Sequence, residues 1–275
     1  MFQGDLSALK DAFCDLFFPP SCAFCGRATM DGTFLRGICE TCSESILPIE
    51  PPICQRCGLS FPGLNDRAAE ICGHCLADPP PYERARFGVR YDGELRRALV
   101  RFKYYRMLSL SGVLGGILIE AFHRHFTPGQ FDLIIPIPIS KRRLLIRGFN
   151  QSAILARLLS AHTGISADLT RLRKVKETLP QVGLPRSERV ANIRNSFGVS
   201  RPRRIQGRRV LLVDDVATTG ATIAEAARTL QRAKAASVDA LVLAFRVTSS
   251  AQSLANSADE ATADDAPDTR FARQP

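Results

Sequence analysis

The sequence lacks the features of a membrane-spanning or secreted chain. Its apolar segments are interrupted well before the length that crosses a bilayer, so no transmembrane helix and no stable membrane insertion are predicted. The first residues, with Asp5 and Asp11 around a short apolar run, have neither the basic start nor the Ala-x-Ala site of a secretory signal. A Gly-x4-Gly-Lys-Ser/Thr phosphate loop is also missing, which argues against a P-loop nucleotide-binding protein. We therefore expect a cytoplasmic protein.

The composition is that of a globular chain. With 275 residues, of which 45% are hydrophobic and 23% charged, it can hold one domain of ordinary size plus a smaller module. The formal charge is +10, and the last 28 residues contribute five acids and two arginines, which leaves +13 on residues 1–247. A basic body suits a polyanionic small molecule and equally suits nucleic acid, so charge alone does not decide between these ligands.

Eight of the nine cysteines form four Cys-x2-Cys pairs. Thirteen residues separate the first two pairs and fourteen separate the last two. Two intervening residues let both sulfurs reach one tetrahedral ion, so the pairs predict two structural Zn²⁺ sites with four cysteines each. Gly26 and Gly58 follow a second cysteine, where a zinc knuckle turns at positive φ. The predicted ligands are Cys22, Cys25, Cys39 and Cys42 in the first site and Cys54, Cys57, Cys72 and Cys75 in the second.

Two other interpretations of the cysteines carry less weight. A disulfide framework belongs to secreted chains, and no secretory signal is recognisable. An iron–sulfur cluster has other spacings than these paired ones. His74 lies between two predicted ligands and is expected to be a bystander.

The stretch 210–223 is the most informative one. Val210 to Val213 form an uninterrupted apolar run, which is typical of a parallel strand buried on both faces. Asp214 and Asp215 follow, then a loop of small residues and the start of a helix, with Thr222 and Glu225 in the Thr-x-x-Glu spacing of a capping box.

That arrangement predicts a phosphorylated sugar as ligand. The N-terminus of a helix offers free N–H groups and a partial positive charge to a phosphate. The two acids repel a phosphate, but they can accept hydrogen bonds from vicinal hydroxyls. We therefore expect a ribose 5-phosphate group at the carboxyl ends of parallel strands. Its phosphate would lie on Val216, Ala217, Thr218, Thr219, Gly220, Ala221 and Thr222.

The remaining elements fit an α/β domain. Strands are predicted over 85–91, 131–139 and 240–245, and helices over 94–106, 108–126 and from residue 151. In the helix over 94–106, Leu95, Leu99 and Phe102 are expected inward. Its basic residues are expected outward: Arg96, Arg97, Arg101, Lys103 and Arg106.

A cationic loop is predicted directly after the strand over 131–139. It contains Ser140, Lys141, Arg142 and Arg143, with Arg147 slightly beyond. Parallel strands end at a common edge, so this loop is expected on the same edge as Asp214, where its charges suit a pyrophosphate. An ordinary solvated basic turn is the alternative.

The stretch around Asp214 resembles the motif with which type I phosphoribosyltransferases bind phosphoribosyl pyrophosphate (PRPP), and the cationic loop resembles their pyrophosphate loop. Together with the cysteine pairs and the Arg-Gly-Phe-Asn-Gln run at 147–151, these features are similar to the ComF family, linked with natural competence and use of external DNA. The resemblance implies a type I phosphoribosyltransferase fold, a twisted and mainly parallel sheet flanked by helices, after a double zinc ribbon. The predicted divisions are an amphipathic helix (1–20), the ribbons (21–78), the transferase-like domain (82–247) and a disordered tail (248–275).

The resemblance also implies roles. Asp214 and Asp215 would bind the ribose hydroxyls of PRPP in its Mg²⁺ complex and serve pentosyl transfer, and the segment 172–197 would be a mobile loop over the ligand. That loop would carry Arg173, Thr178, Gln181, Arg189 and Asn192, although a solvated hairpin with a short helix fits its composition as well. Thr218 stands where purine-salvage members carry an acidic base, so the acceptor stays open. The alternative function is a nucleotide- or single-stranded-DNA-binding module that works with DNA-uptake proteins.

Overall fold

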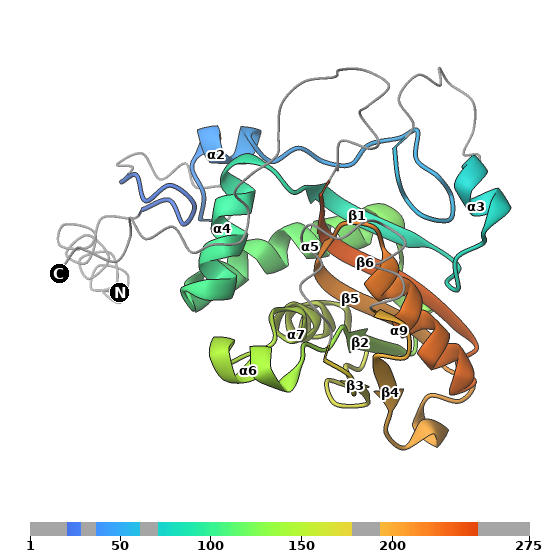
Figure 1. Cartoon of the computed structure of the whole chain (residues 1–275). Coiled ribbons are helices and arrows are strands. Elements are labelled where there is room, and N and C mark those ends of the chain that lie inside the picture. Colours follow the sequence, from blue (N-terminus) through green and yellow to red (C-terminus); the bar gives the residue numbers. More distant parts are fainter. Residues whose placement is uncertain (1–20, 29–36, 61–70, 178–192, 247–275) are drawn as a thin grey trace, which may run out of the picture.

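The computed structural model describes residues 21–28, 37–60, 71–177 and 193–246 (Figure 1). Three predictions therefore lie outside the described residues: the helix within 1–20, the tail at 248–275, and the part of the expected mobile loop that contains Thr178, Gln181, Arg189 and Asn192.

The centre of the fold is a four-stranded parallel sheet (Figure 1). Its strands lie in the order β1-β6-β5-β2, so the strand that carries Asp214 and Asp215 is flanked on both sides. Their bounds are β1 (Ala85–Arg90), β2 (Leu133–Pro136), β5 (Arg209–Ala217) and β6 (Ser237–Phe245). The prediction of a parallel α/β sheet is confirmed.

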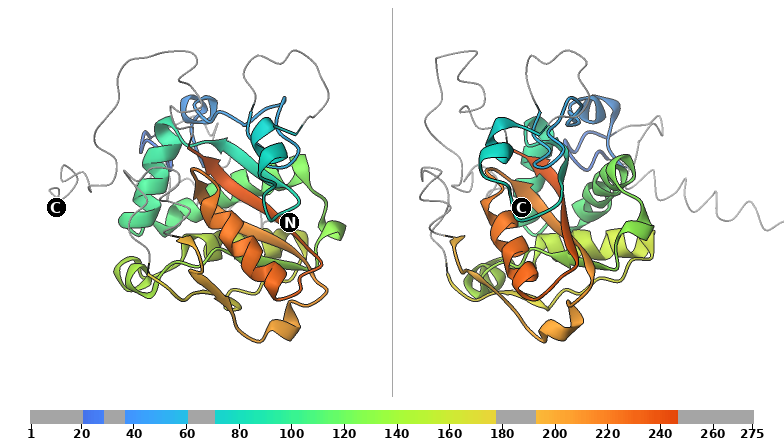
Figure 2. Two further views of the ribbon diagram at one scale, coloured as in Figure 1. Left: turned by 45° about the vertical axis from the view of Figure 1, so that its right-hand side comes forward. Right: turned by 90° about the vertical axis from the view of Figure 1, so that its right-hand side faces the viewer.

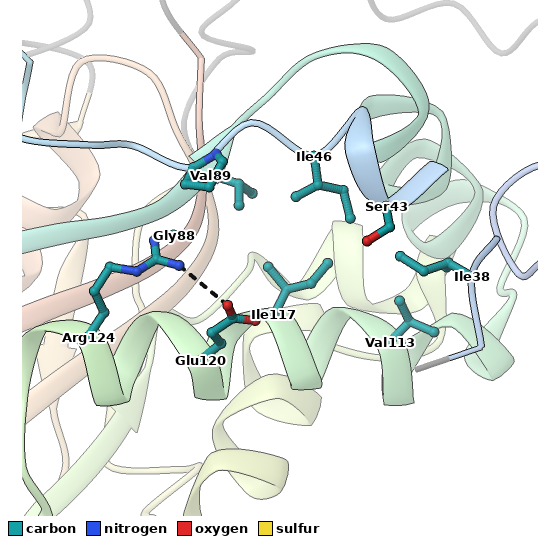
Figure 3. Close-up of a pocket in the computed structure, with 10 residues that line it drawn as sticks. Ile38, Ser43, Ile46, Gly88, Val89, Val113, Ile117, Glu120 and Arg124 are labelled. Carbon is teal, nitrogen blue, oxygen red and sulfur yellow. Dashed lines mark ion pairs between the residues drawn. The ribbon is translucent and has the colours of Figure 1, made fainter. Parts of the chain in front are cut away.

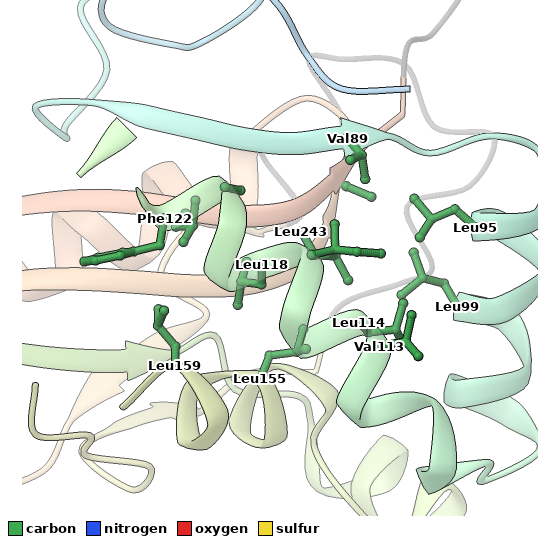
Figure 4. Close-up of a cluster of buried hydrophobic side chains, with 14 of the residues drawn as sticks. Val89, Leu95, Leu99, Val113, Leu114, Leu118, Phe122, Leu155, Leu159 and Leu243 are labelled. Atoms are coloured by element: carbon green, nitrogen blue, oxygen red, sulfur yellow. The ribbon is translucent and has the colours of Figure 1, made fainter. Parts of the chain in front are cut away.

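Helices cover both faces of this sheet (Figure 2). On one face, α5 (Ser111–His125) and α7 (Gln151–Thr163) pack together in a hydrophobic core (Figure 4). Leu211 and Val213 of β5 belong to the same core. On the other, α9 (Ala221–Arg232) packs on Val210 and Leu212. The apolar run of β5 is uninterrupted because its alternate side chains enter two different cores.

The other elements complete the two layers. The antiparallel pair of β3 (Leu172–Lys174) and β4 (Phe197–Val199) joins the α9 side. On the opposite side, α4 (Gly93–Tyr104) buries Leu95, Leu99 and Phe102 as predicted. The short elements are α2 (Glu40–Glu44), α3 (Gly73–Ala77), η1 (Leu108–Leu110), η2 (Pro128–Gln130), α6 (Lys141–Arg147) and η3 (Pro202–Arg204). None of the described helices has the length and apolarity to cross a membrane.

The first ribbon shares the main core of the molecule. Phe24 is 1% exposed and lies in the same cluster as α4 and α5. Arg101 of α4 donates hydrogen bonds to the carbonyls of Ala23 and Phe24, so the prediction that Arg101 points outward is wrong. A cavity of about 270 Å³ remains between α2, β1 and α5, lined by Ile46 and Ile117 among others (Figure 3).

The second ribbon lies against the edge strand β1. The amide of Ala85 donates to the carbonyl of Arg56 over 2.8 Å, and Arg86 donates to the carbonyl of Gln55 over 2.9 Å. Between the ribbons, Pro48 forms an antiparallel bridge with Val89. The chain in and between the ribbons therefore covers the outer edge of β1, which no other described strand of the sheet pairs with. The predicted division between 21–78 and 82–247 stays a prediction.

Candidate functional site

The acidic pair lies within β5, because the strand continues through Asp214 and Asp215 to Ala217. Asp215 is 8% exposed and both of its oxygens have partners. Its Oδ1 accepts the amide of Val216 over 2.7 Å, and its Oδ2 lies 3.0 Å from Nζ of Lys103. The pair is thus presented from the carboxyl end of a central strand, with one acid already neutralised.

Asp214 has a different environment from its neighbour. Its Oδ1 accepts the Ser152 hydroxyl over 2.8 Å and the Asp215 amide over 2.9 Å. Burial and the charge of Asp215 raise the pKa of Asp214 to about 7, although Ser152 and Lys103 act in the opposite direction. This carboxyl group therefore changes its charge near neutral pH.

Lys103 belongs to the site, contrary to the outward orientation predicted from the sequence. It was expected to point outward from α4, whereas its side chain is only 15% exposed and reaches Asp215. Burial lowers the pKa of Lys103, but the charge and hydrogen bond of Asp215, together with the charges of Tyr91 and Asp214, raise this pKa above its ordinary value. The signal was present: residue 103 follows Leu95 and Leu99 at steps of four, which places it on the buried stripe.

Lys174 is a second cation near the acids. It lies at the end of β3, with its Nζ 5.4 Å from the centre of the Phe197 ring on β4. Burial and the nearby charge of Arg143 lower the pKa of Lys174 to about 8, and the charge of Asp214 partly opposes this. At this position the charge of Lys174 interacts with both Arg143 and Asp214. No local pattern in the sequence marks it.

The turn after β5 leads into α9 as expected, but its cap differs. Val216 and Ala217 end the strand, residues 218–220 turn, and Ala221 and Thr222 begin the helix. Gly220 is the N-cap at φ +73°, a conformation that favours glycine. The prediction that Thr222 and Glu225 form a capping box is wrong. Glu225 instead accepts the backbone amide of Asn195 over 3.0 Å.

The cationic residues after β2 begin a helix. Lys141, Arg142 and Arg143 form the first turn of α6, and the Ser140 hydroxyl caps it by accepting the Arg143 amide over 3.3 Å. The expected loop is therefore a helical turn. Because β2 and β5 pair in parallel, it begins at the same sheet edge as the acids, as predicted. Arg147 is directed elsewhere and donates to the Tyr104 hydroxyl over 3.1 Å.

The cysteines form the two predicted groups of four. In each group all four sulfurs lie within 4.8 Å of one another, and none of the eight is in a disulfide. The Sγ atoms of Cys25 and Cys39 are 3.8 Å apart, as are those of Cys57 and Cys72. Two thiolates on one tetrahedral zinc at about 2.3 Å lie about 3.8 Å apart, so the donors fit zinc. Both groups are four-cysteine sites that support structural Zn²⁺.

The knuckle geometry agrees with the sequence pattern. Gly26 and Gly58 have φ of +73° and +70°, as predicted. Backbone amides also point at sulfur: Cys39 donates to Sγ of Cys22 and Cys72 donates to Sγ of Cys54, both over 3.3 Å. Such bonds stabilise thiolates, the form that binds a metal. With all four positions of each site filled by protein, the zinc would be structural.

Two known protein families match separate parts of the chain. Residues 13–76 match the family described as Double zinc ribbon domain, and residues 145–263 match the Phosphoribosyl transferase domain. A DNA utilization protein YhgH from Shigella flexneri is 35% identical over 205 residues, which cover 74% of this chain and 87% of that protein.

Other relatives carry competence names. Competence protein F from Haemophilus influenzae is 30% identical over 71% of this chain and 85% of its own. Competence protein ComFC from Bacillus subtilis is 28% identical over 75% and 83%. Among solved structures, an adenine phosphoribosyltransferase from Thermoanaerobacter pseudethanolicus is 18% identical, covering 52% of this chain and 83% of that one, with a TM-score of 0.32.

Proposed function

Because the chain belongs to the ComF family, the competence-related family of YhgH and competence proteins F and ComFC, we propose that it binds PRPP in its Mg²⁺ complex and transfers or handles the phosphoribosyl group. One observation carries this proposal: the acids of β5, the turn into α9 and the cationic start of α6 lie at one edge of the sheet. These are the three parts that a sugar with phosphates at both ends requires.

The ribose 5-phosphate would bind between β5 and α9. Gly220 has no side chain, so the backbone can approach phosphate oxygens closely, and the first turn of α9 has N–H groups without helical acceptors. The proposed phosphate segment runs from Val216 to Thr222, and its helix is 12 residues long. Asp214 and Asp215 precede it and would accept the ribose hydroxyls, since charged acceptors form the stronger hydrogen bonds.

The pyrophosphate would lie toward the first turn of α6. Lys141, Arg142 and Arg143 supply positive charge there, and Lys174 adds an amine close to Arg143 and Asp214. Ser140 and Arg147 belong to the same proposed segment. Arg147 already contacts Tyr104 and Gln151, so we assign it to holding α6 in place beside α4 and α7.

We expect Mg²⁺ to arrive bound to PRPP and not to be held in advance by the acidic pair. Asp215 is already paired with Lys103, so the two carboxylates do not form a cage of several charged oxygens such as a resident divalent cation needs. When bound to PRPP, Mg²⁺ would neutralise part of the pyrophosphate charge. The residues of the chain would hold the sugar and exclude water around it.

Transfer would break the bond between the anomeric carbon and the pyrophosphate oxygen, whose electron pair leaves with pyrophosphate. A lone pair of the acceptor would form the new bond to that carbon, and the acceptor would lose a proton. Thr218 cannot serve as a carboxylate base for this proton. The acceptor would therefore have to be a good nucleophile itself or bring its own base.

A second candidate function is the binding of single-stranded DNA at the same edge. Tyr104 and Tyr105 are 44% and 39% exposed, and the guanidinium of Arg147 lies 4.8 Å from the centre of the Tyr104 ring. Exposed aromatic rings beside cations are the usual platform for unpaired bases. The names of the relatives, DNA utilization protein and competence protein, favour a role in handling DNA.

Calorimetry with PRPP in the presence and absence of Mg²⁺ tests the first proposal. We expect binding with Mg²⁺ and much weaker binding after chelation by excess EDTA under conditions where the ribbons retain zinc. Ribose 5-phosphate should compete, because it shares the proposed phosphate and hydroxyl contacts. A folded, zinc-loaded protein that ignores PRPP under both conditions would contradict the proposal.

A further inference from the structure

The buried ion pair between Lys103 of α4 and Asp215 of the acidic pair costs free energy to form. Lys103 and Asp215 have side chains that are 15% and 11% exposed, so both charges are largely removed from water. Desolvation of an ion pair commonly offsets much of its Coulomb attraction. Replacing both members of such a pair by apolar residues of similar volume is often neutral or stabilising. The lysine therefore calls for an explanation beyond stability.

The four carboxylate oxygens of the pair are not equivalent. Both oxygens of Asp215 are occupied, by the Val216 amide and by Lys103. Oδ1 of Asp214 accepts from Ser152 and from the Asp215 amide. Within residues 21–28, 37–60, 71–177 and 193–246, no donor or cation reaches Oδ2 of Asp214. Among the described parts of the chain, that oxygen is therefore the one without a partner, and we assign it to the ligand.

We propose that Lys103 is a positioning residue of the phosphoribosyl site: it neutralises Asp215, holds it toward α4 and leaves Asp214 as the carboxylate that accepts the sugar hydroxyls. This inference rests on the proposed function and divides its acidic pair into two roles. Asp215 pairs with Lys103 and holds β5 against α4, and Asp214 contacts the ligand.

The electrostatics of the site give Lys103 a measurable effect. Adjacent carboxylates repel. Among the described residues, the charged groups that act on Asp214 are Asp215 from its own strand, Lys103 from α4 and Lys174 from β3. Ser152 of α7 contributes a hydrogen bond. Without Lys103, the charge of Asp215 acts on Asp214 uncompensated, so Asp214 is protonated over a wider pH range and accepts sugar hydroxyls poorly.

Three variants test this through the pH dependence of Mg-PRPP binding. Lys103→Met removes the charge at similar volume, and Lys103→Arg retains it. Arg97→Met is the matched control, since it removes one charge from the same helix where the side chain is 75% exposed and pairs with Glu94. Wild-type affinity should rise with pH around a midpoint near 7, which reflects Asp214.

In Lys103→Met this midpoint should move upward by about one pH unit, which corresponds to about fivefold weaker binding at pH 7. Lys103→Arg and Arg97→Met should keep the wild-type midpoint. The protonation of PRPP itself is common to all variants and does not change the comparison. A loss in Lys103→Met that is equal at every pH would overturn the inference, because it would indicate a merely structural role.

A ligand-free measurement separates this inference from the proposed function. The ¹³C carboxyl resonance of Asp214, assigned with Asp214→Asn, can be titrated in wild type and Lys103→Met without PRPP. An upward move of its pKa in the variant supports the electrostatic role even if PRPP does not bind, whereas an unchanged pKa overturns it. Should Lys103→Met fail to fold, Lys103→Gln, which keeps a donor for Asp215, carries the same expectation.

Discussion

The hydroxyl of Ser152, at the start of α7, donates a 2.8 Å hydrogen bond to Oδ1 of Asp214 on β5. This bond joins a covering helix to the carboxyl end of a central strand. It also supports the charged form of an acid whose burial raises its pKa to about 7. Holding a carboxylate in a buried position costs stability whenever the group is ionised.

The first prediction follows from that pKa. Because the pKa of Asp214 is raised from 3.8 to about 7 on folding, its proton stabilises the folded state at low pH, and this contribution is lost as pH rises through 7. Asp214→Asn should therefore be more stable than wild type at pH 8. The advantage should grow by roughly 1–3 kcal/mol between pH 5 and pH 8.

Urea denaturation at both pH values measures this difference. Asp78→Asn is the control, because Asp78 is exposed and lies outside the acidic pair. An Asp214→Asn variant whose stability relative to wild type is the same at pH 5 and pH 8 would contradict the assignment of a neutral-pH titration to Asp214.

The second prediction compares equivalent glycines of the two ribbons. Both have positive φ, but a Cβ at Gly26 would meet nothing within 4 Å, whereas one at Gly58 would lie 2.3 Å from the carbonyl oxygen of Ala85. Gly26→Ala should cost only the backbone strain, about 1–2 kcal/mol. Gly58→Ala should cost more, because the second ribbon must also move away from β1.

Chemical denaturation of the two variants, each with its zinc content measured, tests that comparison. Equal losses of stability would show that the second ribbon does not need close contact with β1.

The third prediction concerns the metal. We expect two zinc ions per chain by elemental analysis of reduced protein, and loss of structure on chelation, because the metal-bound loops have little core of their own. The loss should extend beyond the ribbons, since Phe24 is part of the core that includes α4 and α5. Hydrogen exchange in α4 should therefore increase after chelation. Freshly purified protein without zinc would contradict the prediction.

The fourth prediction concerns Glu225, whose side chain is 1% exposed in its ion pairs with Arg228 and Arg232. The arginine side chains are about half exposed, so these pairs should contribute little. The hydrogen bond from the Asn195 amide to Glu225, which joins α9 to the segment before β4, should contribute more than these ion pairs. Glu225→Ala should lose about 1–3 kcal/mol, and Glu225→Gln, which keeps an acceptor, should lose less. Equal losses in thermal denaturation would assign the effect to charge.

The parts of the fold that local pattern determines were predictable. The run Val210 to Val213 identified a strand buried on both faces, and the spacing of the cysteines identified two four-sulfur groups. The position of Asp214 at the sheet edge also followed, because parallel strands share the direction of their ends. Each of these signals depends only on residue type and separation along the chain.

The other parts depend on contacts that sequence separation hides. Lys103 follows the buried stripe of α4, yet a lysine is normally placed outward unless its acidic partner, 112 positions later, is already located. Lys174 comes near Asp214 only after β3 pairs with β4. The capping box at Thr222 failed because Gly220 takes the N-cap position through its backbone conformation, which residue type alone does not reveal.

The most direct test of the account is Mg-PRPP calorimetry on wild type and the double variant Asp214→Asn with Asp215→Asn, alongside single-stranded DNA binding by the same proteins. An asparagine can still accept a hydrogen bond but lacks the charge that strengthens it. We expect the double variant to lose most of its PRPP affinity and to bind DNA as well as wild type or more tightly, since two anions are gone. Intact PRPP affinity in the double variant, or wild-type protein that ignores PRPP while it binds DNA with a steep salt dependence, would contradict the account.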